Sequence, residues 1–131
     1  MRYRALFECA TDAIFLMRGN RFIDCNASAL TMFDRSRTDI IGHEPEQFSP
    51  PMQPDGRRSR EIARDKILAA YAGQAQFFEW EHCRRDGTPF PAEVSLKVIV
   101  VGDEEFILAI VRDITERKRV ERDLEDARIA T

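Results

Sequence analysis

The stretch that decides the fold is FILAIVRDITERK, residues 106–118. Its first part, Phe106–Val111, is six apolar residues without a break, which is typical of a strand buried on both faces. Its last part, Glu116–Lys118, is fully charged, and only Arg112 and Asp113–Thr115 lie between the two. This abrupt change indicates a strand in the middle of a sheet that leads directly into a solvent-exposed helix.

The segment from Glu116 to Thr131 is mostly charged, yet a few small or apolar residues recur in it at spacings of four, three and four. These are Val120, Leu124, Ala127 and Thr131. The spacing predicts a coiled-coil seam about two heptads long. A helix of this length, about 24 Å, is only marginally stable alone in water. We therefore expect it to pair with a second copy of the chain, which makes a homodimer.

Two further strands are predicted before the central one, at Phe77–Cys83 and Phe90–Val100. The second alternates apolar and polar residues, the pattern of a strand with one buried face. Asp86-Gly87 and Gly102-Asp103 are typical hairpin turns, because these residues tolerate the backbone angles that tight turns need. The C-terminal half is therefore predicted as a three-stranded antiparallel meander.

The N-terminal part predicts a second hairpin. Ala13–Met17 is apolar on both faces, Gly19-Asn20 makes the turn, and Arg21–Cys25 returns with charged residues. A short amphipathic helix precedes this hairpin, with one face made by Tyr3, Leu6, Phe7 and Ala10.

Three helical segments are predicted between the two groups of strands. Asn26 caps the first, over residues 27–33, because its side-chain oxygen can accept a hydrogen bond from an unpaired amide. Thr38 caps a single turn that ends at Gly42. Ser59 caps the longest helix, which ends at Gly73.

The loop over residues 43–58 has no periodicity and holds four of the six prolines. Loops this long in a compact domain are usually lids or mobile segments.

The fold class is therefore α+β. Strands that are apolar on both faces belong in the middle of a sheet, and charged strands belong at its edges. Numbered along the chain, the five strands then form an antiparallel sheet of order 2-1-5-4-3, with helices on one face. We expect residues 1–115 to be one domain and residues 116–131 to begin a helix leading to an effector domain beyond this fragment.

Composition excludes several classes of function. The net charge is −3, from 20 basic and 23 acidic residues, whereas a nucleic-acid binder carries a basic surplus. Cys9, Cys25 and Cys83 lie far apart, so neither a disulfide framework nor a metal site is expected. Signal-peptide and membrane-spanning patterns are absent from the sequence. We expect a cytoplasmic fragment without membrane contact, whose parent protein is free to carry an anchor.

Five short motifs, in this order, resemble those of a PAS domain, across about residues 3–118. They are Ala13-Ile14-Phe15, Asp24-Cys25-Asn26-Ala27-Ser28-Ala29-Leu30, Ile40-Ile41-Gly42, Arg85-Asp86-Gly87-Thr88-Pro89-Phe90 and Val111-Arg112-Asp113-Ile114-Thr115-Glu116-Arg117-Lys118. The resemblance implies a PAS fold and a bacterial sensory module of an intracellular signal-transduction protein. It also implies a signalling helix that controls a histidine kinase of a two-component system, or a diguanylate cyclase.

The junction Asp113–Thr115 is the most specific of these motifs. Thr115 is placed to cap the exit helix through its hydroxyl, and Lys118 stands where a full capping box has Glu. The resemblance implies that Asp113, which lies near Arg112 and Arg117, is a polar latch between sheet and helix. The alternative is that Asp113 and Thr115 only end one element and begin the next.

The resemblance also raises the question of a cofactor. Haem-binding relatives place a histidine on the long helix, which here, over residues 60–72, has none. His43 and His82 are interpreted as solvated or salt-bridged side chains. Light-sensing relatives need a reactive cysteine in a different motif from the Cys25-Asn26 found here. The sequence thus argues against haem and covalent flavin, and leaves non-covalent flavin or a small metabolite open.

The predicted pocket walls are the apolar side chains that alternation turns inward, together with two aromatic residues of one strand. They are Phe33, Ile41, Phe48, Ile67, Phe78, Trp80, Val94, Leu96, Leu108 and Ile110. Such a lining suits an apolar or weakly polar molecule, or simply a filled core.

Motifs of catalysis are absent from the sequence, so we expect the fragment not to be an enzyme. Glu79 and Glu81 could form a carboxylate pair, but a solvated strand face explains them better.

Two functional hypotheses remain. In the first, the domain senses a small ligand or a redox state and passes the change through Asp113–Thr115 to the dimeric helix. In the second, a PAS domain with a filled core only dimerises its effector.

Overall fold

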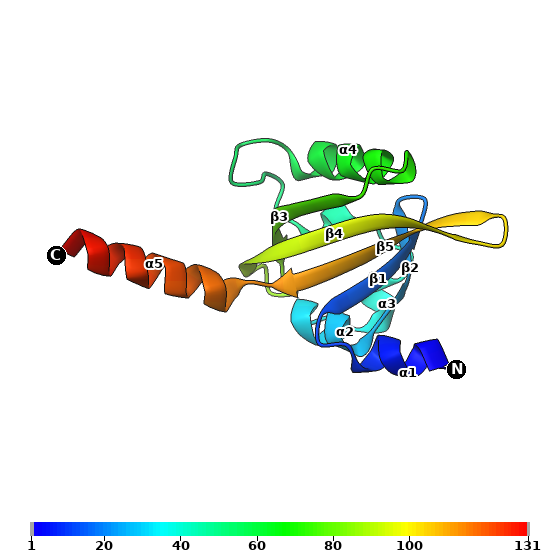
Figure 1. The fold of residues 1–131 in the computed structure, drawn as a ribbon, viewed down its shortest axis with the longest axis horizontal. Coiled ribbons are helices and arrows are strands. Elements are labelled where there is room, and N and C mark those ends of the chain that lie inside the picture. The colour runs from blue at the N-terminus through cyan, green and yellow to red at the C-terminus, as the bar shows by residue number, and fades with distance from the viewer. Residues whose placement is uncertain (1, 131) are drawn as a thin grey trace.

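The computed structural model describes residues 2–130, with side chains from Arg4 onward. The elements follow the predicted order (Figure 1). They are α1 (Arg2–Cys9), β1 (Ala13–Arg18), β2 (Arg21–Cys25), α2 (Ala27–Phe33), α3 (Arg37–Ile40), the 3₁₀ turn η1 (Pro45–Phe48), α4 (Ser59–Tyr71), β3 (Gln76–Cys83), β4 (Pro89–Val101), β5 (Glu104–Asp113) and α5 (Thr115–Ala130).

The five strands form one sheet of order β2-β1-β5-β4-β3, in which all neighbours are antiparallel. This confirms the α+β PAS fold and the strand order predicted from the sequence. The two strands that are apolar on both faces, β1 and β5, lie side by side in the interior of the sheet. Burying both faces of these strands is what places them there, because an edge position would expose apolar surface to water.

One face of the sheet, here called the inner face, carries the core. Helices α2 and α4 contact it, and α1 packs beside α2. Fully buried side chains on this face include Met17 of β1 and Ile107 of β5. Helix α5 leaves the end of β5 and projects away from the body (Figure 1).

Asn26 caps α2 as predicted, and it also joins three elements. Its Oδ1 atom accepts hydrogen bonds from the amides of Ala29, at 3.1 Å, and Ile14, at 2.9 Å. Its Nδ2 atom donates to the carbonyls of Phe7, at 2.9 Å, and Asp12, at 3.0 Å. The side chain is completely buried, so these four bonds compensate for the loss of water at a polar group.

The predictions for the other two caps were wrong. Ser36, not Thr38, precedes α3, and the Asp39 carboxylate accepts the Ser36 amide. Ser59 is the first residue of α4 rather than its cap, and its buried hydroxyl donates to the Pro50 carbonyl. Ser59 therefore fixes the preceding loop to the helix instead of satisfying the helix end.

The loop over residues 43–58 is more ordered than its sequence suggests. It contains η1, a backbone bridge between Met52 and Arg58, and the buried side chain of Gln53. Loop and helix are joined where Gln53 Nε2 donates to Ser59 Oγ at 2.9 Å. The proline-rich segment is thus an ordered part of the domain that is fixed to α4.

The predicted seam on α5 is exposed in the single chain. Val120 and Leu124 are 47% and 66% exposed, and Ala127 is exposed as well. Thr131 lies outside the described residues, as does the side chain of Tyr3. The coiled coil and the homodimer stay predictions.

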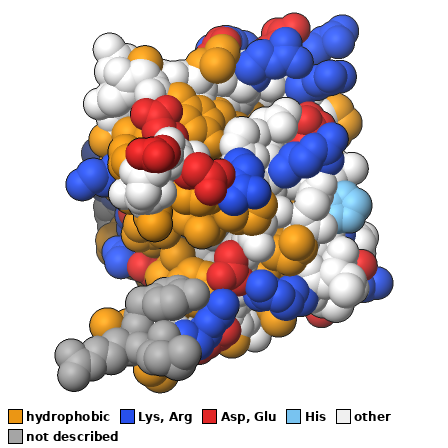
Figure 2. Space-filling model, turned by 90° about the vertical axis from the view of Figure 1, so that its right-hand side faces the viewer, with side chains coloured by type: hydrophobic (Ala, Val, Ile, Leu, Met, Phe, Trp, Pro, Cys, Tyr) orange, Lys and Arg blue, Asp and Glu red, His pale blue; other side chains and the backbone are white. Residues whose placement is uncertain are grey.

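At the opposite end of the molecule, the β4–β5 hairpin extends beyond the body (Figure 1). Val100 and Val101 are exposed there beside Glu104 and Glu105. Figure 2, which views the molecule from this end, shows acidic side chains gathered over hydrophobic surface.

Candidate functional site

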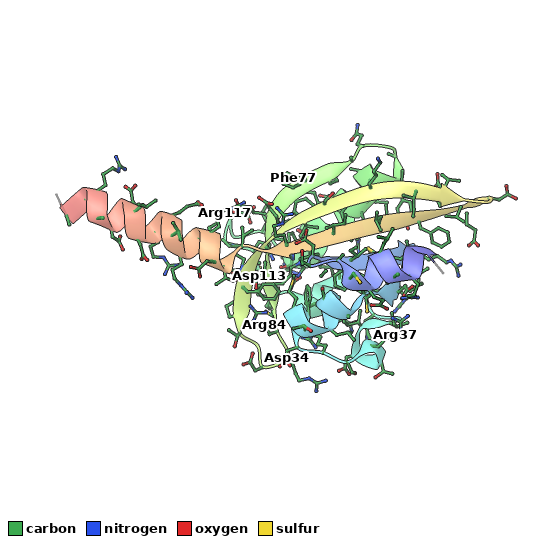
Figure 3. All side chains as sticks on the ribbon, turned by 60° about the horizontal axis from the view of Figure 1, so that its bottom comes forward. Asp34, Arg37, Phe77, Arg84, Asp113 and Arg117 are labelled. Atoms are coloured by element: carbon green, nitrogen blue, oxygen red, sulfur yellow. The ribbon has the colours of Figure 1, made fainter. Side chains whose placement is uncertain are left out.

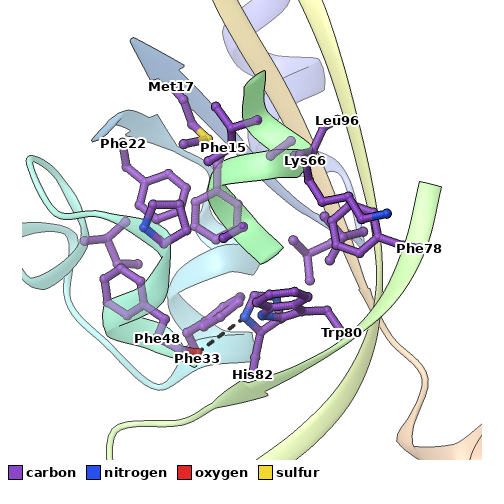
Figure 4. A pocket seen from close by; sticks show the side chains of 17 residues that line it. Phe15, Met17, Phe22, Phe33, Phe48, Lys66, Phe78, Trp80, His82 and Leu96 are labelled. Atoms are coloured by element: carbon purple, nitrogen blue, oxygen red, sulfur yellow. Dashed lines mark hydrogen bonds between the residues drawn. The ribbon is translucent and has the colours of Figure 1, made fainter. Parts of the chain in front are cut away.

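An apolar cavity of about 60 Å³ lies between the inner face of the sheet and the helical layer (Figure 4). All five strands, α2, α3, η1 and α4 contribute to its wall. The wall is mostly aromatic and aliphatic, so the low polarity of its interior strengthens any hydrogen bond made inside it.

Phe33 is the centre of the aromatic part of the wall. Its ring meets those of Phe15 and Phe90 edge to face, each with centroids 5.4 Å apart, and that of Phe48 at 6.3 Å. Edge-to-face contacts of this kind add about 0.5–1.5 kcal/mol each beyond burial. They hold the rings in fixed positions around the cavity.

Seven of the ten residues predicted as pocket walls line this cavity: Phe33, Phe48, Ile67, Phe78, Trp80, Val94 and Leu96. Ile41, Leu108 and Ile110 do not line it; in their places are Ile40, Ala109 and Val111.

The facing of β5 was predicted wrongly because a strand apolar on both faces has no period that reveals which side is inward. Strand pairing decides it. Val94 lies opposite Val111 and Leu96 opposite Ala109, and residues paired across strands point to the same face. Leu108 and Ile110 therefore point to the outer face of the sheet.

The interpretation of His82 as a solvated or salt-bridged side chain was wrong. It is only 8% exposed, lines the cavity, and lies with its ring centroid 4.9 Å from that of Phe33. Burial lowers the pKa of His82 to about 4, and a hydrogen bond to the Phe48 carbonyl only partly opposes this. Strand alternation could have predicted this position, because Phe78, Trp80 and His82 are each two residues apart and therefore point to the same face of β3.

The proline-rich loop closes the cavity along the edge of β3. The Trp80 indole Nε1 donates to Ser49 Oγ at 2.9 Å. The Gln53 side chain pairs with the backbone of Glu81, accepting its amide at 2.9 Å and donating to its carbonyl at 3.1 Å. Gln53 thus replaces a neighbouring strand at this edge, which fixes the wall that Trp80 forms.

Lys66 and Phe78 lie where the cavity meets the exterior. The Lys66 ammonium lies 4.9 Å from the centre of the Phe78 ring, a cation–π distance. Both residues, with Trp80, also line an open groove that Lys118 and Arg122 of α5 border. The same side chains therefore separate the cavity from a surface that α5 shares.

The junction between β5 and α5 is built around Asp113 (Figure 3). Its Oδ1 atom accepts hydrogen bonds from the amide and the hydroxyl of Thr115, and its Oδ2 atom pairs with Arg84 at 3.0 Å. Arg84 also donates to the carbonyl of Met32 and lies 4.1 Å above the Phe90 ring. Asp113 therefore connects α5 with the β3–β4 turn and, through Arg84, with α2.

Burial by itself raises the pKa of Asp113, but the hydrogen bonds from Thr115 and Arg84 outweigh burial and hold the pKa below its usual value. The carboxylate is ionised at neutral pH and forms an ion pair with the Arg84 guanidinium.

The junction differs from the prediction at Thr115, which was expected to cap α5 through its hydroxyl. Arg112 pairs with Asp12 at 3.1 Å, and Thr115 donates its hydroxyl to Asp113 instead of capping α5. The partner that sequence reasoning missed, Arg84, is 29 positions away from Asp113. No local spacing relates the two residues.

Arg117 and Lys118 join the first turn of α5 to the outer face of the sheet. Arg117 pairs with Glu93 at 2.6 Å and with Glu79 at 3.4 Å, and Lys118 pairs with Glu79 at 2.9 Å. The hydrogen bond from Lys118 lowers the pKa of Glu79. Glu79 thus serves α5 docking and forms no carboxylate pair with Glu81.

The structure thus combines an antiparallel sheet with helices on one face, an apolar cavity against that sheet, and a helix that leaves the central strand. The family model described as PAS domain matches residues 11–116, and the chain belongs to the PAS domain family. It is a PAS sensory domain for signal transduction, a module common in histidine kinases and other sensor proteins, and it is itself non-catalytic.

The chain is 26% identical over 122 residues to a methyl sulfide methyltransferase-associated sensor of Methanosarcina acetivorans, covering 92% of this chain. It spans 12% of that sensor and 17% of a second curated relative.

Among solved structures, the chain is similar to the PAS domain of an HTR-like protein from Haloarcula marismortui, with a TM-score of 0.73 and 24% identity over 86% of this chain and 89% of that one. It is also similar to a domain of a sensory box sensor histidine kinase/response regulator from Geobacter sulfurreducens. That match has a TM-score of 0.69 and 25% identity, and covers 86% of this chain and 91% of the other.

Among residues 2–130, we find no helix with the length and apolar character that crossing a membrane requires.

Proposed function

We propose that this domain senses a small apolar or weakly polar molecule in its cavity and transmits occupancy to α5. The observation that carries the proposal is the apolar cavity on the inner face of the same sheet whose central strand continues into α5. An internal apolar space with few polar groups is the usual character of a small-molecule site.

The size of the cavity limits the ligand. About 60 Å³ holds about two water molecules, at about 30 Å³ each in the liquid, or a molecule of a few heavy atoms. Sites for drug-sized ligands and cofactors are usually about 300–1,000 Å³. A haem or a flavin ring system does not fit the cavity with its side chains as placed. This favours a small metabolite, and ligand sensing over redox sensing through flavin.

Two contacts support a route from the cavity to α5. Strand β3 carries Trp80 and His82 in the cavity wall and Glu79, bound to Lys118 of α5, on its other face. Arg84, directly after β3, holds Asp113 at the start of α5. A ligand that displaces β3 changes both contacts, provided that it binds one arrangement of α5 better than the other.

What α5 controls is proposed on two grounds: the proteins that contain similar domains, and the predicted coiled-coil seam. A second copy of the chain pairs along Val120, Leu124 and Ala127, and the paired helices control a histidine kinase or a diguanylate cyclase. The Geobacter sulfurreducens domain, which belongs to a sensor histidine kinase/response regulator, supports the kinase.

The alternative function is a ligand-free domain that only dimerises its effector. The observation that favours it is how far Phe33, Phe48, Phe78 and Trp80 already fill the space, which leaves only about 60 Å³.

Thermal-shift screening and native mass spectrometry with small neutral molecules separate these functions. For sensing, we expect at least one compound to raise the melting temperature and to be retained by the protein. Ala63 lines the cavity, so Ala63→Leu should fill it and abolish the effect. Ala72→Leu, at an exposed position after α4, is the matched control. A screen in which no compound stabilises the protein leaves the dimerisation function.

Sedimentation velocity tests the dimer. Leu124→Asp should weaken self-association, because it places a charge in the seam. Leu6→Asp, at an exposed residue of α1, is the control. If Leu6→Asp alone dissociates the dimer, the interface lies on α1.

A further inference from the structure

We infer that His82 makes the cavity selective for a small uncharged molecule that carries an O–H or N–H group, which donates a hydrogen bond to the Nε2 atom of His82. The inference rests on the proposed function and specifies its ligand.

The hydrogen bond of the other ring nitrogen fixes the role of Nε2. His82 Nδ1 lies 3.3 Å from the Phe48 carbonyl oxygen, drawn as a dashed line in Figure 4. A carbonyl oxygen only accepts, so Nδ1 must carry the proton. In a neutral imidazole the second nitrogen then has a free lone pair, and Nε2 is a pure acceptor.

This acceptor is buried and has no protein partner among the described residues. Buried polar atoms without a partner are rare in folded proteins and require a reason. The ring is enclosed by Phe33, Trp80 and Phe90, whose side chains offer it no free donor. A donor inside the cavity, from a ligand or from the water that a ligand displaces, is therefore the group that would satisfy it.

The remaining polar nitrogens of the wall do not compete for the role. The Trp80 indole nitrogen already donates to Ser49. The Lys66 ammonium stacks on Phe78 at the rim rather than beside His82. A cationic ligand would meet no carboxylate in the wall, and an anion would face the lone pair of Nε2. Charge burial without a partner is costly, so the ligand is uncharged.

The low pKa of His82, about 4, keeps the imidazole neutral at physiological pH. The acceptor is therefore present whenever a ligand arrives.

The test is an NMR titration of the isotopically labelled chain with two probes of equal size, 2-propanol and acetone. Both have four heavy atoms, but only the alcohol donates a hydrogen bond. Methyl signals of Ile67, Val94 and Leu96 report whether a probe enters the cavity, and the ¹⁵N signal of His82 Nε2 reports whether the acceptor is engaged. His43, whose Nδ1 atom lies 2.8 Å from Gln47 Oε1 outside the cavity, is the internal control.

We expect 2-propanol to shift the cavity methyls and His82 Nε2 together, with about fivefold tighter binding than acetone, the usual size of one net hydrogen bond. His43 should not move with the methyls. Equal affinities with an unmoved Nε2 signal would overturn the inference and leave the proposed function intact. Unmoved methyls with both probes would overturn both.

His82→Phe keeps an aromatic ring of similar size and removes the acceptor. In this variant the two probes should bind equally, with the alcohol weakened about fivefold and acetone unchanged. A variant that still prefers the alcohol contradicts the inference. Titration of the unmodified chain decides the matter if the variant fails to fold.

Discussion

The two faces of strand β3 show how one strand serves two different environments. On the inner face, Phe78, Trp80 and His82 line the cavity, and the last two are buried. On the outer face, Phe77 is 72% exposed and Glu79 forms ion pairs with α5. The inner face is held by apolar packing, whereas the outer face is joined to its neighbour by charge.

The difference matters for signalling because the two kinds of contact respond to different conditions. Apolar packing depends on shape and is insensitive to salt, whereas exposed ion pairs are weak and screened. Glu79 and Glu93 also lie directly opposite each other on β3 and β4, a repulsive pair that Arg117 bridges. The contacts on the cavity side thus depend on packing, and those on the α5 side depend on charge and on salt.

The largest effect is expected from matched aromatic truncations on the two faces. Trp80→Ala should lower the free energy of unfolding by about 3–5 kcal/mol, because it empties part of the core and frees the Ser49 hydroxyl. Phe77→Ala, on the same strand, should change it by no more than about 0.5 kcal/mol. Urea denaturation followed by circular dichroism measures both. Similar losses for both variants contradict the two-faced description of β3.

A second effect concerns His82 and pH. Its pKa is about 4 in the folded chain and about 6.5 when unfolded, so between these values the unfolded chain binds the additional proton. Stability is therefore unaffected above about pH 6.5 and falls as the pH drops, by about 3 kcal/mol at pH 4. The nearby cations are Arg35, above the Phe48 ring, and Arg84, above the Phe90 ring.

Unfolding free energies measured from pH 7 to pH 4 test this prediction. His82→Phe should lack this part of the pH dependence, and His43→Phe, outside the cavity, should keep it. Equal pH profiles for the unmodified chain and His82→Phe would show that His82 is not buried in its neutral form.

A third, smaller effect is expected at the junction. Asp113→Asn removes the charge that faces Arg84 and should cost about 1–2 kcal/mol, since both side chains are partly buried. The pKa of Asp113 is lowered in the folded chain, so its contribution is present above the unfolded pKa and is lost as pH falls through the folded value. Asp12→Asn, which breaks the more exposed pair with Arg112, is the control. A larger loss from Asp12→Asn than from Asp113→Asn refutes the latch.

The architecture could be predicted from the sequence because its signals are local. Hairpin turns such as Gly102-Asp103 occur within a few residues, and a strand that is apolar on both faces can lie only inside the sheet. Because β5 is apolar on both faces, the sequence did not show which of its residues point inward: Leu108 and Ala109 are both apolar. Only the register against β4 distinguishes them.

The parts of the site that escaped prediction depend on contacts between distant residues. Alternation along β3 placed Phe78 and Trp80 on one face and would have placed His82 there, but the charged neighbours of His82 suggested solvent. The pairing of Arg84 with Asp113 and of Gln53 with Glu81 is set by tertiary packing. Such contacts leave no periodic signal in the chain.

The smallest effect tests whether charge alone holds α5 to the outer face. Arg117→Ala removes both links to Glu79 and Glu93 and leaves these carboxylates opposed. We expect little change in global stability but faster amide hydrogen exchange in the first turns of α5, because this helix buries no side chain. Arg119→Ala, whose partner Glu116 lies on the same helix, should leave exchange nearly unchanged. Added salt should reproduce the Arg117→Ala effect in the unmodified chain and have a smaller effect in the variant, where the Lys118–Glu79 pair is the link to the outer face that remains to be screened. If salt instead loosens α5 equally in both, the ion pairs of Arg117 do not hold the helix, and Lys118 and Asp113 are left as its attachments to the sheet.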